Sequence, residues 1–195
     1  IDVIEIMTKH NNICNHIHLP VQSGSSRILK LMNRGYDREK YLQLINDIKH
    51  RMPDCSISMD MIIGFCSETE QDHKDTLSLM DKVEYNFGYM FKYSVRPNTP
   101  AARMKDDIPE NIKQRRLAEI IDKQQAHSLK HMKAKVGNTY KVLIEGFSKK
   151  SAQYFYGRTT YNSAVIFEKE KYKLGDYVMV KIEDCTSATL KGKVI

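Results

Sequence analysis

Strand and helix patterns alternate along the first hundred residues, and this order restricts the possible folds more than any other feature of the chain. Strands are expected at 16–21, 56–63 and 89–93. Amphipathic helical patterns separate them, the first capped by Asp37 and the second opened by a Thr69–Asp72 capping box. Successive strands joined through helices form parallel sheets with right-handed crossovers. The sequence therefore predicts an α/β fold, either an open sheet or part of a (β/α) barrel.

A long helix is expected next, starting at Pro109 and ending at Gly137, with Val136 among its inward-facing apolar residues. Its basic residues, Lys113 and Arg116 among them, are interpreted as a solvated surface, with a role along an RNA backbone as the alternative. After this helix the pattern changes to five short strands rich in β-branched and aromatic residues, which predicts a small barrel of the oligonucleotide-binding type. The predicted domains are 1–137, including the linking helix, and 138–195.

A polar, glycine-containing elbow follows the first strand and leads into a short helix. Ser25 or Ser26 is expected to cap this helix, and Gly35 to end it in the left-handed conformation. Ligands of α/β folds bind at the carboxyl ends of the strands, which makes the elbow a candidate site. Serine and glycine also occur in such turns without a ligand, so the spacing alone leaves both interpretations open.

The formal net charge of +7 favours an acidic partner such as RNA, and residues 138–195 hold ten basic against six acidic side chains. The four cysteines lie far apart, without the close spacing of a zinc or iron–sulfur site. We expect free thiols and assign no metal ligand. No apolar run is long enough to span a bilayer and no signal-peptide pattern occurs, which predicts a cytoplasmic protein without membrane contact. Residues 1–7 have the pattern of a helix end, so the chain is expected to begin inside a larger protein.

Three motifs carry a resemblance to a known family: HLPVQSGS…LKLMNRGY at 18–36, SMDMIIGFCSETE at 58–70 and YSVRPNTPAA at 93–102. In this order they resemble the radical S-adenosylmethionine (SAM) methylthiotransferases, most of all the subfamily that thiomethylates isopentenyladenosine next to the tRNA anticodon. The resemblance covers essentially the whole chain. It implies the second half of a partial (β/α) barrel followed by a TRAM domain. Cys66-Ser67 replaces the family's more usual Pro-Gly, which questions the loop conformation at Ser67.

The resemblance also implies cofactors and partners. The full-length enzyme would use SAM and two 4Fe–4S clusters, whose cysteine ligands would precede residue 1. An electron donor such as a flavodoxin or ferredoxin and the anticodon arm of a tRNA would be its partners. The isolated chain is therefore expected to be inactive, and radical cleavage of SAM by this chain alone would contradict that expectation.

By the same resemblance, polar groups and strand ends are assigned to SAM, with the ribose near Gln22 and the adenine near Ile62. Arg96 is assigned to an anionic group, because guanidinium makes two parallel hydrogen bonds with carboxylate or phosphate. The alternative for Arg96 is a salt bridge to Asp60 or Glu68, and Glu68 equally fits a carboxylate at a helix N-terminus. His16 and His18 are interpreted as structural, and no catalytic acid or base is assigned. The candidate SAM-binding residues are Gln22, Ser23, Ile62, Gly64, Glu68, Ser94 and Arg96.

Basic and aromatic side chains are interleaved in residues 147–162 of the predicted barrel. Cations pair with phosphates, and aromatic rings stack on unpaired bases. Strand alternation turns about half of these aromatic side chains into the barrel core, so the RNA contacts are assigned to polar residues instead. These residues are Lys149, Lys150, Arg158 and Asn162.

Three alternatives remain at this stage. One sister family acts on threonylcarbamoyladenosine in tRNA, and another on an aspartate of a ribosomal protein. The elbow reads PVQSGS rather than the PLQH typical of the protein-modifying sister, which favours tRNA. A non-enzymatic RNA-binding module would account for the small barrel but not for the three strand–helix units.

Overall fold

The computed structural model describes residues 2–195, so Ile1 of the predicted opening helix lies outside the described residues. The chain divides into two compact units. The α/β unit comprises residues 18–53 and 57–125, and the barrel unit comprises residues 2–17, 54–56 and 126–195. The sequence-based boundary at residue 137 stays a prediction.

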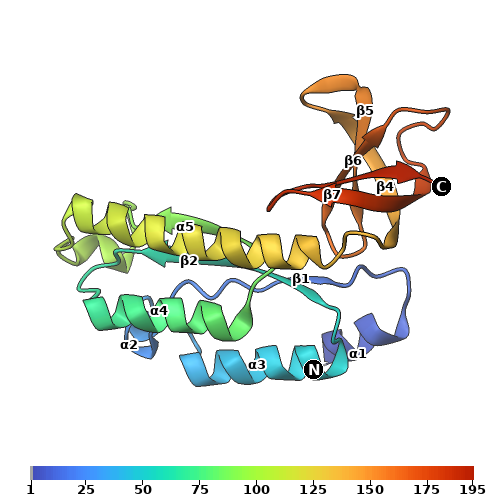
Figure 1. The fold of residues 1–195 in the computed structure, drawn as a ribbon. Helices are drawn as coiled ribbons and strands as arrows, with labels where there is room; N and C mark the ends of the chain where they lie inside the picture. The colour runs from blue at the N-terminus through green and yellow to red at the C-terminus, as the bar shows by residue number, and fades with distance from the viewer. Residues whose placement is uncertain (1) are drawn as a thin grey trace. The chain divides into compact units, whose positions relative to one another are not determined.

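A three-stranded sheet in the order β1–β2–β3 forms the centre of the first half of the chain (Figure 1). Its strands are β1 (His16–His18), β2 (Ser56–Ile63) and β3 (Phe87–Lys92). β2 and β3 pair in parallel, with Asp60 opposite Tyr89 and Ile62 opposite Phe91. The predicted parallel sheet is confirmed, with β1 shorter than expected and β3 starting two residues earlier.

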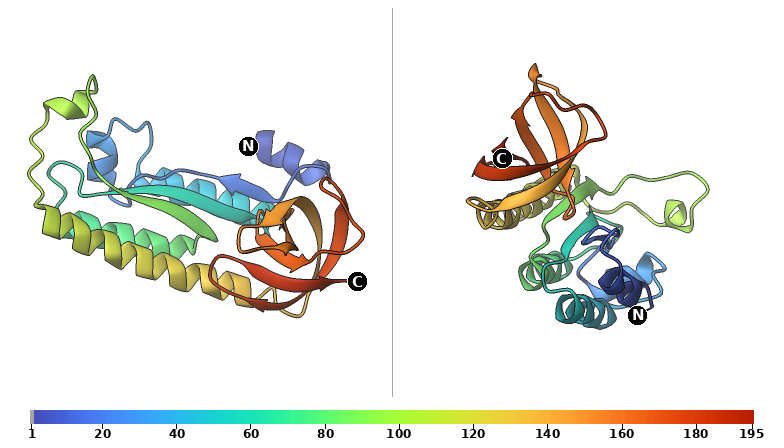
Figure 2. Two further views of the ribbon diagram at one scale, coloured as in Figure 1. Left: turned by 90° about the horizontal axis from the view of Figure 1, so that it is seen from above. Right: turned by 90° about the vertical axis from the view of Figure 1, so that its right-hand side faces the viewer.

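The α-helices of the α/β unit are α2 (Ser26–Leu31), α3 (Arg38–Arg51), α4 (Glu70–Val83) and the first part of α5 (Glu110–Lys133), and Pro100–Arg103 form a short 3-10 helix. α3 and α4 lie on one face of the sheet, and the first part of α5 runs beyond the β3 edge (Figures 1 and 2). The expected caps are present: Asp37 accepts a hydrogen bond from the Lys40 amide, and Thr69 and Asp72 form the capping box. These side chains explain where α3 and α4 begin.

The end of α2 differs from the prediction. Ser25 caps the helix, but it ends at Leu31, and the left-handed residue after it is Asn33 with φ 56°. Gly35 does not have a positive φ. Asparagine tolerates the left-handed conformation because its short polar side chain can bond to the local backbone. The helix therefore ends earlier than the glycine indicated.

α5 confirms the predicted long helix but not the solvated role of all its basic residues. Lys113 and Arg116 are only 3% and 4% exposed, and each is paired with a carboxylate. Val136 lies beyond the end of the helix and is 38% exposed, so its inward orientation was wrong. Long basic side chains can be buried when their charged ends are paired, which apolar periodicity does not reveal.

The two faces of the sheet differ in their cover. Met59, Met61 and Ile63 of β2 are fully buried, whereas Ile62 is partly exposed. On β3, Tyr89 and Phe91 expose more than half of their surface. β2 is therefore not covered on both faces at Ile62, although the residues at its end are wholly apolar. Among the described residues, this second face has no helix across it, as the view from above shows (Figure 2).

The barrel unit contains α1 (Asp2–Lys9), the last turns of α5 and a closed barrel in the order β4–β5–β6–β8–β7. All five predicted strands are confirmed. Alternate residues point inward and form one core that includes Val142, Phe155, Phe167 and Val180. The strands are β4 (Thr139–Ser148), β5 (Ser151–Thr159), β6 (Ala164–Glu168), β7 (Tyr177–Cys185) and β8 (Leu190–Val194).

The four cysteines are free, as expected, with Cys55 and Cys66 buried. Within residues 2–195, no group of three or more His, Cys, Asp or Glu side chains is arranged to hold a metal ion. None of the helices described is long and apolar enough to cross a membrane.

Candidate functional site

The elbow joins the sheet at Gln22. Its backbone amide donates to the Asp60 backbone carbonyl at 2.9 Å, and its backbone carbonyl accepts from the Ile62 backbone amide at 2.9 Å. This pairing extends the sheet by one parallel bridge. Gln22 has φ 70°, a left-handed conformation that costs a non-glycine residue about 1–2 kcal/mol. Strain of this kind concentrates at functional sites, where the surrounding structure holds the residue in place.

Polar groups of the elbow also fix it to α4. The Ser25 hydroxyl donates to Asp72 at 2.6 Å, and the Arg27 guanidinium pairs with the same carboxylate. Burial raises the pKa of Asp72, but the hydrogen bonds from Arg27, Ser25 and Thr69 outweigh it and hold the pKa well below its usual range. The Ser23 hydroxyl accepts from the Ser25 amide at 3.2 Å. Both serine hydroxyls therefore already have partners within the fold.

The loop after β2 is organised around the buried carboxylate of Glu68. Glu68 Oε1 accepts from the Gly64 amide at 3.1 Å and from Arg116 at 2.9 Å. Burial raises the pKa of Glu68, while the Gly64 amide and Arg116 oppose that rise. The salt bridge considered for Arg96 is thus made by Arg116 instead, and Asp60 lies 3.5 Å from His18 Nε2.

The replacement of glycine by Ser67 does not change the type of backbone conformation in this loop. It adopts φ 62°, so the loop keeps a left-handed residue at this position without a glycine. We expect Ser67→Gly to stabilise the protein by roughly 0.5–1 kcal/mol, because the left-handed strain is larger than the entropy that glycine adds to the unfolded chain. Chemical denaturation followed by circular dichroism measures the change.

Ser67→Ala is the matched control for this prediction. It removes the same hydroxyl, which accepts a long hydrogen bond of 3.4 Å from Arg27, but it keeps a Cβ on the strained backbone. Equal stability of the glycine and alanine variants would show that backbone strain at Ser67 is negligible.

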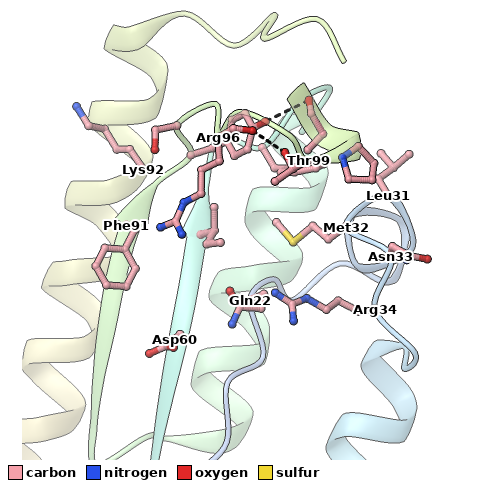
Figure 3. A pocket seen from close by; sticks show the side chains of 16 residues that line it. Gln22, Leu31, Met32, Asn33, Arg34, Asp60, Phe91, Lys92, Arg96 and Thr99 are labelled. Atoms are coloured by element: carbon pink, nitrogen blue, oxygen red, sulfur yellow. Dashed lines mark hydrogen bonds between the residues drawn. The ribbon is translucent and has the colours of Figure 1, made fainter. Parts of the chain in front are cut away.

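A cavity of about 620 Å³ opens at the carboxyl edge of the sheet (Figure 3). Four of the seven candidate SAM residues line it: Gln22, Ile62, Ser94 and Arg96. Ser23, Gly64 and Glu68 do not line it and are buried in the elbow and in the loop after β2. The remaining lining residues are Leu31, Met32, Asn33, Arg34, Asp60, Phe65, Phe91, Lys92, Tyr93, Thr99, Pro100 and Ala101.

The cavity lining combines apolar and polar groups. Met32, Ile62 and Phe91 supply apolar surface, and Gln22 and Ser94 supply amide and hydroxyl groups. Burial raises the pKa of the Tyr93 phenol, whose ring packs edge-on against Phe65 with centroids 4.9 Å apart. A concave site with an apolar wall and a few polar groups is the usual form of a small-molecule site.

Sequence reasoning missed Arg34, although it lies within the first of the three motifs. It follows Asn33, whose left-handed backbone turns the chain after α2 toward the cavity. The sequence signal that could have indicated Arg34 is Asn-Arg-Gly at the end of a short helix, which is typical of a turn.

The candidate RNA residues lie on the barrel unit. Lys149 and Lys150 form the exposed turn between β4 and β5. Arg158 donates to Asn162 Oδ1 at 2.5 Å and to Glu145 at 3.2 Å, so its charge is partly compensated. The structure therefore brings Arg158 and Asn162 together, and the RNA-binding roles of all four residues stay predictions.

Two family models match the chain. The Radical SAM superfamily model matches residues 1–80, and the TRAM domain model matches residues 133–195. The relatives named tRNA-2-methylthio-N(6)-dimethylallyladenosine synthase are similar along the whole chain: those of Christiangramia forsetii and Chloroherpeton thalassium are 58% and 53% identical over 100% of it. The chain belongs to this family.

The chain covers 41% and 43% of the length of these two family members. A relative of the same name from Flavobacterium johnsoniae is 57% identical over 99% of the chain and 40% of its own length. Among solved structures, coproporphyrinogen III oxidase (HemN) from Escherichia coli, described as a radical SAM enzyme, matches with a TM-score of 0.53. It is 15% identical, and the match covers 82% of this chain and 43% of that one. At this identity the likeness concerns the fold alone.

Proposed function

We propose that the chain is the C-terminal part of a tRNA methylthiotransferase, which adds a methylthio group to C2 of isopentenyladenosine next to the anticodon by radical SAM chemistry. The observation that carries the proposal is the cavity at the carboxyl edge of the sheet, in a chain 58% identical to a synthase of this name. The cavity draws its lining from the strand ends, where α/β folds bind ligands.

The lining of the cavity fits SAM. The Gln22 amide can donate and accept hydrogen bonds with ribose hydroxyls, and Ile62 offers an apolar surface for the adenine ring. Ser23 in the elbow, and Gly64 and Glu68 in the loop after β2, hold these segments in place through hydrogen bonds and do not contact SAM themselves. When bound with its iron–sulfur cluster, SAM supplies the radical that activates the adenosine. The residues of this chain bind and orient the two molecules.

The barrel unit is proposed to hold the anticodon arm of the tRNA through Lys149, Lys150, Arg158 and Asn162. Exposed cations meet phosphates, and the partly exposed ring of Tyr154 is available for stacking. A second iron–sulfur cluster, a flavodoxin or ferredoxin as electron donor and a cytoplasmic location complete the proposal.

Gln22→Gly is expected to weaken SAM binding without destabilising the protein. The glycine removes the side chain from the cavity and relieves the left-handed strain at φ 70°. Gln22→Ala removes the same amide but keeps the strained backbone, so it should bind SAM equally weakly and unfold more easily. Equilibrium dialysis and denaturation of the full-length protein measure both effects. Unchanged SAM affinity in both variants would contradict the assignment of Gln22.

The direct test incubates the full-length protein, with its clusters and a reductant, with SAM and anticodon-arm RNA. Three RNA samples are compared, which carry isopentenyladenosine, threonylcarbamoyladenosine or unmodified adenosine at the target position. Mass spectrometry of the digested nucleosides should detect a methylthio group only in the RNA with isopentenyladenosine. Product in the RNA with threonylcarbamoyladenosine would support the tRNA-modifying sister instead. Binding without product in any of the three samples would favour an RNA-binding module or the protein-modifying sister.

A further inference from the structure

We infer that Arg34 and Arg96 together bind a phosphodiester of the substrate RNA strand at the cavity, rather than the carboxylate of SAM. This inference rests on the proposed function and deepens it, because it gives the cavity an RNA-binding side of its own. It assigns a role to Arg34 and changes the role of Arg96.

Both guanidinium groups face the same cavity from different segments. Arg34 comes from the loop after α2 and Arg96 from the loop after β3, and both line the cavity. Figure 3 shows the two side chains turned toward the side of the cavity where Gln22 lies. Like charges that share a site repel each other, so this arrangement favours an anion between them.

Within residues 2–195, neither guanidinium has a carboxylate partner. The neighbouring cation, Lys92, differs, because its ammonium group is paired with Glu110. Asp60, the one acidic residue of the lining, faces His18, with 3.5 Å between Asp60 Oδ1 and His18 Nε2. Neither arginine therefore has an ion-pair partner of its own, and both belong to the residue type that binds carboxylate and phosphate through two hydrogen bonds.

The charge of the two possible ligands decides between them. SAM carries a sulfonium, an ammonium and a carboxylate, so the one group of SAM that a guanidinium can bind comes with two cations attached. A phosphodiester carries one negative charge with no cation attached. Its two free oxygens can each accept hydrogen bonds from a guanidinium. The pair of arginines therefore fits the RNA strand better than SAM.

The test uses the full-length protein and three variants: Arg34→Gln, Arg96→Gln and Lys74→Gln. Lys74 is exposed on α4 and does not line the cavity, so Lys74→Gln removes the same charge elsewhere. Binding of isopentenylated anticodon-arm RNA is measured at several salt concentrations, and SAM binding by equilibrium dialysis. Circular dichroism checks that each variant is folded, and Arg34→Met, which also removes the charge, replaces Arg34→Gln if the latter is not.

We expect each arginine variant to weaken RNA binding roughly tenfold or more and to lower the slope of log affinity against log salt by about 0.7. SAM affinity should stay unchanged, and Lys74→Gln should resemble the wild type. Loss of SAM affinity in the arginine variants, or RNA affinity and salt slope equal to those of Lys74→Gln, would overturn the inference while leaving the proposed function intact. Wild-type RNA binding no better than to a random duplex would overturn both.

Discussion

Arg116→Ala is expected to destabilise the α/β unit by about 3–5 kcal/mol, because it leaves the buried carboxylate of Glu68 without its cation. Arg116 donates to Glu68 Oε1 at 2.9 Å and to the Glu68 carbonyl at 3.0 Å, and the two side chains are only 5% and 1% exposed. After the substitution, the Gly64 amide still donates to this carboxylate. Denaturation followed by circular dichroism reports mainly this unit, since the other is mostly β-structure.

The stability lost in the Arg116→Ala variant should grow as the pH rises. Burial already raises the pKa of Glu68 above its ordinary value of 4.5, and removal of Arg116 raises the pKa further. The folded variant then binds a proton more tightly than the unfolded chain. Its additional instability should vanish below about pH 4.5, where both states are protonated, and should grow as the pH rises through the folded pKa.

Arg115→Ala is the matched control. Arg115 is the preceding residue of α5 and also pairs with two carboxylates, Glu70 at 2.7 Å and Glu119 at 2.6 Å, but these groups are largely exposed. Exposed ion pairs contribute little, so this variant should change stability much less than Arg116→Ala. Similar losses in both variants, or a loss independent of pH in Arg116→Ala, would show that the buried Glu68 charge is not the cause.

Local sequence signals predicted the elements of this fold well. The apolar run of β2, the capping box at Thr69 and the alternation in β4 to β8 depend on residues close together in the chain. The Glu68–Arg116 pair joins residues 48 positions apart. Only the packing of α5 beside the loop brings them together, so the charges of α5 looked like a surface.

The candidate site was predicted only in part, because some of its features are local and others depend on contacts between distant residues. Gln22, Ile62, Ser94 and Arg96 line one cavity because each follows or ends a strand, and parallel strands end at the same edge. Ser23 and Glu68 also follow strands, but neighbouring donors already use their oxygens. Which polar group is free for a ligand depends on hydrogen bonds made across the fold. Whether these residues bind SAM stays a prediction.

Among substitutions that add one methyl group to the elbow, Gly24→Ala is expected to lower the stability of the protein the most. A Cβ at Gly24 would lie 2.4 Å from Thr76 Cα and 2.7 Å from the Asp75 carbonyl oxygen, so the elbow and α4 would have to move apart. The Gly24 amide also donates to Thr76 Oγ1 at 3.0 Å. Overpacking against backbone costs about 1–3 kcal/mol or more, and here no flexible side chain can yield. Denaturation of the variant measures this loss.

The same displacement should reach the cavity, because Gln22 lies two residues before Gly24 and is bonded to β2 on its other side. We therefore expect Gly24→Ala to lower SAM affinity as well as stability in the full-length protein. Gly35→Ala is the control, since a Cβ there meets nothing within 4 Å and its backbone does not have a positive φ. If Gly24→Ala loses stability but binds SAM like the Gly35→Ala variant, the elbow can shift against α4 without moving Gln22. Contact between the elbow and α4 would then support the fold alone, and the position of Gln22 would depend on its two hydrogen bonds to β2.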